Sequence, residues 1–263
     1  MKVRIDKLLV ERGLVATRER AQALILAGKV LVNEQKIEKS GAPVANDVTI
    51  RLLGEDLRYV SRGGLKLEKA LEHWHIDVGG RTCMDVGTST GGFTDCLLQH
   101  GAAEVVAVDT GWGQIDMKLR NDSRVRLLER TNARYLTRDA IAPLTSTPIT
   151  LIAMDVSFIS ATLVLPAVIG SVFGNTAACR RDAVVLVKPQ FEVGREHVGK
   201  GGIVRDAEAQ QSAVAKVRTT VESLGGRCIE VIDSPILGTE GNKEFLLHAE
   251  FPGTIESQLI DTQ

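Results

Sequence analysis

The sequence of 263 residues is poor in cysteine, in aromatic residues and in long hydrophobic runs. No apolar stretch approaches the ~18 residues of a membrane-spanning helix. The N-terminus MKVRIDKLLVERGL carries charges where a signal peptide has an apolar core. The four cysteines are scattered, with neither a CxxC pair nor a histidine spacing that suits zinc. These absences predict a cytoplasmic protein with no membrane segment, disulfide framework or metal site, and with Cys83 and Cys228 as buried free thiols in apolar runs.

Charge is unevenly distributed along the chain. The net charge is −1, but residues 1–62 hold 12 basic and 8 acidic residues, whereas the remainder is net −5. A basic N-terminal segment joined to an acidic remainder favours a polyanion as the partner.

Residues 1–57 have the pattern of a small separate domain. Apolar residues in IDKLLVERGL recur at helical spacing and stop at Gly13, and TRERAQALILAGK predicts a second helix with Thr17 as its N-cap and Gly28 at its end. Alternating VLVNEQKI and VTIRL follow, with a polar NEQ turn. Two short helices and a small sheet are expected.

This segment resembles the S-four-type (alpha-L) RNA-binding domain through R-x-D-x-x-L, TRERA, G-x-V-x-V-N and D-V-T-I. The resemblance implies contacts with RNA phosphates, which give affinity without reading the sequence. Each charge taken singly could equally be a solvated surface residue. Residues 58–62 are expected to form an interdomain linker. The candidate RNA-binding residues are Arg4, Arg18, Arg20, Lys29 and Lys36, together with Arg62 in the linker.

Residues 63–263 alternate between apolar strand-like runs and helical segments. The runs are TCMDVG, EVVAVD, VRLLER, ITLIAMDV, AVVLVK, RCIEVIDSP and KEFLLHAEF. This alternation predicts an α/β fold with a parallel sheet covered by helices on both faces. Ligands of such folds bind beyond the carboxyl ends of the strands.

A glycine-rich turn, DVGTSTGGF, follows the first of these strands. It could be a tight turn with glycines for steric reasons alone, or a site of close backbone approach to a nucleotide. Its spacing is neither G-x-G-x-x-G nor G-K-[ST], which argues against NAD and ATP. The turn instead looks like the S-adenosylmethionine site of Rossmann-like methyltransferases, with Asp109 suited to a ribose diol and Asn132 to the adenine edge. The predicted cofactor-binding residues are Asp85, Gly87, Ser89, Gly91, Gly92, Phe93, Asp109, Asn132 and Asp155.

Charged residues stand where two successive strands end. Asp155 ends ITLIAMDV and Lys188 ends AVVLVK, so their side chains are expected to meet. A buried ion pair without chemistry is the alternative, although such pairs contribute little net stability. Lys66 lies in the first turn of the helix in SRGGLKLEKALEHW, where the helix dipole disfavours a cation. Glu244 precedes the last strand.

Together these motifs resemble the FtsJ-like 2′-O-ribose methyltransferases, and within them the hemolysin-A-type (TlyA) rRNA methyltransferases. The matching segments are RYVSRGG, DVGTSTGGFTDCLL, MDVSFIS, LVKPQFEVG and GNKEFLL. The resemblance implies a K-D-K-E tetrad at Lys66, Asp155, Lys188 and Glu244. It also implies an α/β, Rossmann-like methyltransferase fold with a mostly parallel seven-stranded sheet. The reaction that it implies is S-adenosylmethionine-dependent methylation of the ribose of a cytidine in ribosomal RNA.

The chemistry agrees with that tetrad, because a ribose 2′-hydroxyl must lose its proton as it attacks a methyl group. Lys188 would take the proton and Asp155 would orient it, while Lys66 would stabilise the developing alkoxide and Glu244 would hold Lys66 or the ribose. A monomer acting on ribosomal subunits is expected. The alternatives are a non-catalytic RNA-binding or ribosome-assembly factor and a haemolysin. A base methyltransferase is disfavoured, because the fourth strand ends in DVSF without a proline pair.

Overall fold

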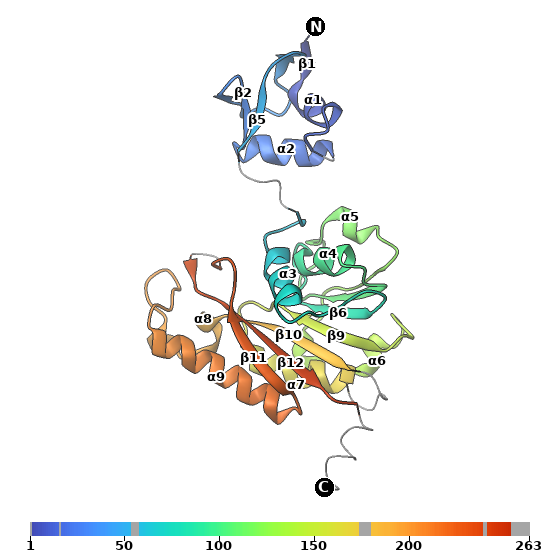
Figure 1. Cartoon of the computed structure of the whole chain (residues 1–263), viewed down its shortest axis with the longest axis vertical. Helices are drawn as coiled ribbons and strands as arrows, with labels where there is room; N and C mark the ends of the chain where they lie inside the picture. Colours follow the sequence, from blue (N-terminus) through green and yellow to red (C-terminus); the bar gives the residue numbers. More distant parts are fainter. Residues whose placement is uncertain (1, 16, 54–57, 174–179, 239–240, 254–263) are drawn as a thin grey trace. The chain divides into compact units, whose positions relative to one another are not determined.

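A computed structural model describes residues 2–15, 17–53, 58–173, 180–238 and 241–253. The chain divides into two compact units, an N-terminal unit (Met1–Arg58) and a C-terminal unit (Tyr59–Gln263). Figure 1 shows the elements of each, coloured along the sequence.

The N-terminal unit has the two helices and the small sheet that its periodicity predicts. Thr17 Oγ1 accepts a hydrogen bond from Arg20 N and caps the second helix, and Gly13 and Gly28 follow the two helices with left-handed φ of 65° and 66°. Its elements are β1 (Lys2–Arg4), α1 (Ile5–Glu11), α2 (Arg18–Leu26), β2 (Val30–Val32), β3 (Gln35–Lys36), β4 (Pro43–Ala45) and β5 (Ile50–Leu52). Strands β3, β2 and β5 form one antiparallel sheet, and β1 pairs with β4.

The C-terminal unit is built on a seven-stranded sheet of order β11-β12-β10-β9-β6-β7-β8. Its strands are β6 (Thr82–Val86), β7 (Glu104–Val108), β8 (Val125–Leu128), β9 (Ile149–Met154), β10 (Arg181–Val187), β11 (Arg227–Asp233) and β12 (Phe245–Phe251). The helices are α3 (Gly63–His73), α4 (Gly92–Gln99), α5 (Met117–Arg120), α6 (Arg138–Ile141), α7 (Ala161–Phe173), α8 (Pro189–Glu192) and α9 (Ala207–Ser223), with short 3-10 turns η1 (Ala133–Tyr135) and η2 (Arg195–His197).

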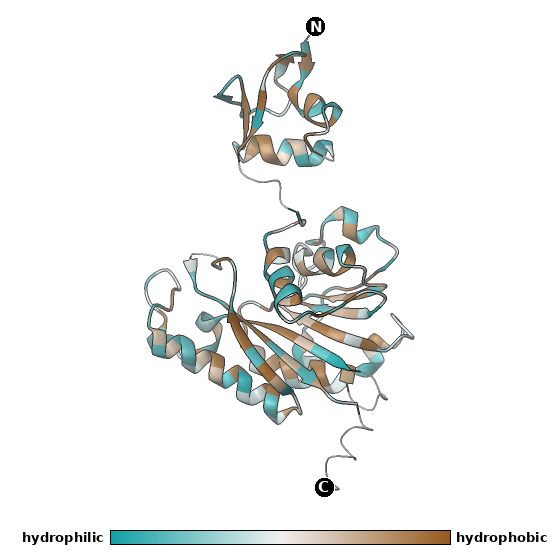
Figure 2. Ribbon diagram, in the orientation of Figure 1, coloured by the Kyte–Doolittle hydropathy of each residue, from teal (hydrophilic) through white to brown (hydrophobic). Residues whose placement is uncertain are grey.

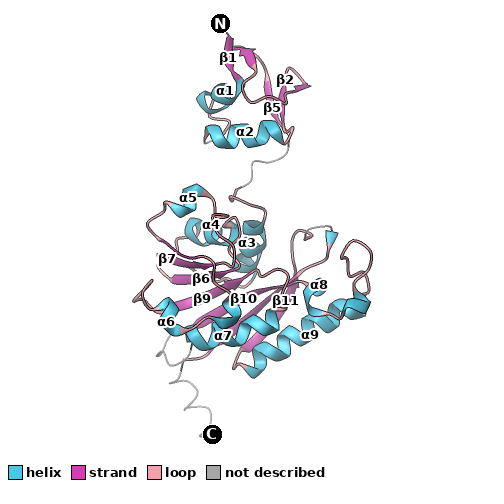
Figure 3. Cartoon of the chain, turned by 180° about the vertical axis from the view of Figure 1, so that it is seen from behind, coloured by secondary structure: helices cyan, strands magenta, loops and turns pink. Residues whose placement is uncertain are grey.

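All seven predicted strands are present, and β12 runs antiparallel between β10 and β11. Helices cover both faces of the sheet, as Figure 3 shows. One hydrophobic cluster fills the face under α7 and α9, and another fills the face under α3 and α4. The central strands β9 and β10 are largely apolar, as Figure 2 illustrates, because both of their faces are buried.

One prediction about burial is wrong. Cys83 is buried, but Cys228 is exposed. The register of β11 shifts between Arg227 and Glu230, and Cys228 has a left-handed φ of 50°, so this end of the edge strand turns its side chain to solvent. Cys179 lies outside the described residues.

Strand register places the polar residues that matter at one edge of the sheet. The parallel strands β6, β7, β9 and β10 end immediately before Gly87, Asp109, Asp155 and Lys188. Val187, the last residue of β10, pairs with Phe245, the first residue of the antiparallel strand β12. Glu244, which precedes β12, therefore lies at the same end of the sheet as Lys188.

Candidate active site

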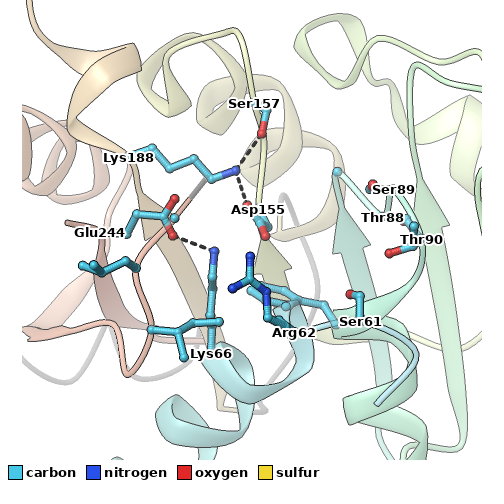
Figure 4. A pocket seen from close by; sticks show the side chains of 17 residues that line it. Ser61, Arg62, Lys66, Thr88, Ser89, Thr90, Asp155, Ser157, Lys188 and Glu244 are labelled. Carbon is cyan, nitrogen blue, oxygen red and sulfur yellow. Dashed lines mark hydrogen bonds and ion pairs between the residues drawn. The ribbon is translucent and has the colours of Figure 1, made fainter. Parts of the chain in front are cut away.

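A cavity of about 290 Å³ opens at this edge, and Figure 4 shows the side chains that line it. Its walls come from the start of α3, the loop after β6, the ends of β9 and β10, and the segment before β12. The lining residues include Ser61, Arg62, Lys66, Gly87, Thr88, Ser89, Thr90, Gly92, Phe93, Asp155, Ser157, Lys188, Leu237 and Glu244.

Two lysine–carboxylate pairs stand in this first cavity. Lys66 Nζ lies 2.6 Å from Glu244 Oε2, and Lys188 Nζ lies 2.6 Å from Asp155 Oδ1. Both lysines and Glu244 are more than nine-tenths buried. Buried charges of this kind must be paired to be tolerated, which explains why each ammonium has its own carboxylate. The structure thus brings together all four residues of the predicted tetrad.

Local structure holds the second pair in place. Asp155 N donates to Val86 O at 2.8 Å, which extends the pairing of β9 with β6 past the end of the strand. Lys188 is extended, with φ −111° and ψ 99°, and Pro189 after it begins α8. The lysine therefore leaves the strand at the cavity mouth instead of continuing into a helix.

The loop after β6 needs glycine at Gly87 because of close packing. Gly87 has φ 88°, and a Cβ there would stand 2.5 Å from Asp155 O. At Gly92, a Cβ would collide with Ser61 Oγ. The first contact brings the loop against the segment that carries Asp155, and the second brings α4 against the residues before α3.

A second cavity of about 320 Å³ adjoins the first and shares Gly87, Ser89, Asp155 and Ser157 with it. Asp109, on its wall, accepts hydrogen bonds from Ser89 N at 2.7 Å and Gly111 N at 2.6 Å. Other lining residues are Val108, Thr110, Gln114, Thr131, Asn132, Ala133, Val156, Phe158, Ile159 and Val164. Asn132 Oδ1 accepts from Arg134 N and so caps η1.

Asp85 lies behind these cavities and is fully buried. Its Oδ2 accepts from Thr94 N at 2.9 Å and Thr94 Oγ1 at 2.6 Å, while Oδ1 has no hydrogen-bond partner within the described ranges. Burial raises the pKa of this carboxyl to about 7, against the opposing effect of the Thr94 hydrogen bonds. Asp85 therefore sits at the end of β6 as a desolvated acid.

The predicted cofactor residues fall into three groups. Gly87, Ser89, Asp109, Asn132 and Asp155 line the second cavity. Gly92 and Phe93 line the first. Asp85 and Gly91 line neither; Gly91 is the N-cap of α4 with φ 97°, and a Cβ there would collide with the side chain of Leu119.

Sequence reasoning missed several lining residues. Ser157 lies inside the quoted motif MDVSFIS, so its position beside Asp155 was a usable signal. Thr110, Gln114 and Thr131 follow strand ends and could have been found by the same rule. Leu237, in the segment before β12, carries no local pattern that marks it as part of a site.

Two of the candidate RNA-binding residues of the N-terminal unit contact a buried acid. Arg4 Nη2 and Arg18 Nε each lie 2.9 Å from Asp6 Oδ2. The hydrogen bond from Arg4 has the largest effect on the pKa of Asp6, and with the one from Arg18 it holds that pKa well below its usual range. Lys36 covers Gly28, where a Cβ would collide with its side chain. In the same unit, Lys29 is exposed and Arg20 is half-buried. Arg62, by contrast, lines the first cavity of the C-terminal unit.

The second cavity fits S-adenosylmethionine on the residues present. Its charged lining residues are Asp109 and Asp155, a match for a cofactor that carries a positive sulfonium. The carboxylate of Asp109, on the wall of this cavity, accepts hydrogen bonds from two backbone amides.

Comparison with known proteins agrees with this geometry. A model of the FtsJ-like methyltransferase family matches residues 59–251, and one of the S4 domain matches residues 3–48. The chain belongs to the FtsJ-like methyltransferase family and carries an S4 domain ahead of the catalytic fold.

Among its relatives, "Putative rRNA methyltransferase YqxC" of Bacillus subtilis is 47% identical over 96% of this chain and 87% of its own length. The 16S/23S rRNA (cytidine-2'-O)-methyltransferase TlyA of Mycobacterium tuberculosis is 44% identical over 94% and 89%. The solved structure "Putative hemolysin from Streptococcus thermophilus" has a TM-score of 0.70 at 42% identity and covers 95% of this chain and 88% of that one.

Proposed function

We propose that this protein transfers a methyl group from S-adenosylmethionine to the ribose 2′-hydroxyl of a cytidine in ribosomal RNA. The observation that carries the proposal is the pair of lysine–carboxylate contacts in a cavity that adjoins the cofactor-sized cavity. The 44% identity to a protein named as a cytidine-2′-O-methyltransferase supports both the reaction and the nucleotide.

Bound S-adenosylmethionine supplies a methyl group on a positively charged sulfur. Lys188 in its amine form would accept the 2′-hydroxyl proton as that oxygen attacks the methyl group that the bound cofactor would supply. Asp155 holds Lys188 at 2.6 Å and orients it. Lys66, held by Glu244, stabilises the negative charge that develops on the oxygen.

The charges of the first cavity suit an RNA strand. Arg62, Lys66 and Lys188 outnumber Asp155 and Glu244 there, which favours a phosphate nearby. The S4 domain supports RNA as the substrate class, and base pairing would have to open so that the ribose reaches the cavity. The proposal includes ribosomal subunits as the target, a monomer as the active species and the cytoplasm as its place of action.

Two rival functions differ from this one in a measurable way. A non-catalytic RNA-binding factor would have no need of S-adenosylmethionine and would not bind it. A haemolysin would lyse membranes; among the described residues, no helix is both long and apolar enough to cross a bilayer.

The test incubates wild-type protein and Lys188→Ala with labelled S-adenosylmethionine and ribosomal subunits that lack the modification. Digested RNA is then analysed by mass spectrometry. We expect 2′-O-methylcytidine from the wild type and none from the variant. Cofactor binding without transfer to either subunit would contradict the ribosomal substrate, and absence of cofactor binding would favour the RNA-binding factor.

A further inference from the structure

Ser157 makes a contact that distinguishes Lys188 from Lys66, the two lysines of the tetrad. Lys188 Nζ donates a hydrogen bond to Ser157 Oγ at 2.6 Å while it also lies 2.6 Å from Asp155 Oδ1. Figure 4 shows both side chains reaching the same nitrogen from the segment after β9. Within the described ranges, Lys66 Nζ has a single hydrogen-bond partner, Glu244.

The number of contacts decides how freely an amino group can rotate. A lysine amino group has three positions around nitrogen, and one contact leaves it free to turn about the Cε–Nζ bond. Lys188 Nζ has two such partners, Ser157 Oγ through a hydrogen bond and Asp155 Oδ1 through an ion pair that lacks hydrogen-bond geometry. Together they restrict this rotation and leave one position for a third partner. For Lys188, which lines the first cavity, this third position carries the proton in the ammonium form and the lone pair in the amine form.

Ser157 also stands where the two cavities meet. It lines both of them, as Asp155 does, whereas Lys188 and Lys66 line the first cavity. The close approach of Gly87 to Asp155 O fixes the backbone two residues before Ser157. The serine hydroxyl is thus held at the junction across which a methyl group would pass.

We propose that Ser157 is a positioning residue that fixes the rotation of the Lys188 amino group so that its third position faces the ribose hydroxyl. This proposal rests on the proposed function. It assigns different tasks to two lysines that otherwise have equivalent carboxylate partners. Lys188, with two contacts, acts directionally on a proton, and Lys66, with one, acts as a positive charge.

The experiment measures kcat, KM for ribosomal subunits and cofactor Kd for three variants. In Ser157→Ala we expect kcat to fall about 10- to 100-fold, the size of effect that misorientation produces, with KM and Kd within twofold of wild type. Ser157→Thr keeps the hydroxyl and should retain kcat within about threefold. Ser171→Ala removes a serine hydroxyl from α7, where it donates to Val168 O, and should match wild type.

A structural role would produce a different pattern. Ser157→Ala with wild-type kcat, a threonine variant as slow as the alanine variant, or a loss confined to KM would each overturn the proposal. In all three cases wild-type protein would still make 2′-O-methylcytidine and Lys188→Ala would not, so the proposed function would stand. Failure of wild-type protein to form that product would overturn both.

Discussion

The two adjoining cavities share a wall but have opposite charge. The first has three cationic and two anionic lining residues, and the second has Asp109 and Asp155 as its charged lining residues. A polyanionic strand and a cationic methyl donor are therefore attracted to different cavities. Asp155 lines both cavities, so the carboxylate that holds Lys188 is also part of the wall of the proposed cofactor site. The difference shows that the charge of each cavity favours a different ligand, while Asp155 is a charged residue that lines both cavities.

Removal of Lys188 should have the largest effect, because it deletes the proposed proton acceptor in the first cavity. In Lys188→Met, kcat should fall about 10²- to 10⁴-fold, the range that a general base contributes. Cofactor Kd, measured by calorimetry, should stay within threefold, since the second cavity is lined by other residues. Lys69→Met, on the exposed side of α3, is the matched control. Loss of cofactor binding in Lys188→Met would contradict the separation of the two cavities.

Breaking the other pair should reduce stability as well as activity. Lys66→Met leaves Glu244, which is 3% exposed, as an uncompensated buried charge, and this costs about 3–5 kcal/mol of unfolding free energy. The double variant Lys66→Met/Glu244→Gln should recover part of that loss because it removes the charge. Urea unfolding followed by tryptophan fluorescence reports on the C-terminal unit, which contains Trp74 and Trp112. Equal stability of the single and double variants would argue against a buried pair.

The acid behind the cavities should make stability depend on pH. The pKa of Asp85 is about 7 in the folded chain and near 3.9 when unfolded, so the folded state holds a proton that the unfolded state releases. The stabilising contribution is complete below about pH 4 and is lost as pH rises through 7, by at most about 4 kcal/mol. Relative to wild type, Asp85→Asn should therefore gain unfolding free energy between pH 5 and pH 8. For Asp139→Asn, an exposed control, that difference should not change.

A change at the second cavity alone should weaken cofactor binding and leave RNA affinity unchanged. Asp109→Ala removes a carboxylate that two backbone amides orient, and hydrogen bonds to a charged group contribute about 1.5–3 kcal/mol. Cofactor Kd should rise about 10- to 100-fold in calorimetry. RNA affinity, measured by filter binding without cofactor, should not change. A matching loss of RNA affinity would mean that the cavities are not separate in function.

The smallest effect is expected in the N-terminal unit. Lys36→Gln and Lys29→Gln should each lower the slope of log affinity against log salt by about 0.7–0.9, one phosphate contact apiece. Arg18→Gln should do the same and also destabilise the unit, because Asp6 would lose a donor. Lys7→Gln, an exposed residue of α1, should leave the slope unchanged. If the slope is as unchanged in the Lys29, Lys36 and Arg18 variants as it is in Lys7→Gln, these charges are solvated surface residues.

Local patterns in the sequence were sufficient for α1, α2 and the seven strands of the C-terminal unit, but they did not predict β1 and β4. The period of IDKLLVERGL, the Thr17 cap and the apolar runs from TCMDVG to KEFLLHAEF each depend on neighbours a few residues away. Asp155 and Lys188 were expected to meet because adjacent parallel strands end at one edge. Patterning was less reliable at the edge strand β11, where a shift in register exposes Cys228.

The sequence by itself therefore determined the order of elements, the glycine-rich loop and the residue types at the strand ends. Only the tertiary structure decided that Lys66 contacts Glu244, 178 residues away, because this depends on β12 running antiparallel between β10 and β11. The same is true of Ser157, whose hydroxyl meets Lys188 across a separation of 31 residues. Local periodicity reflects the backbone of a single segment, whereas these contacts arise from strand order and register, which no single segment contains.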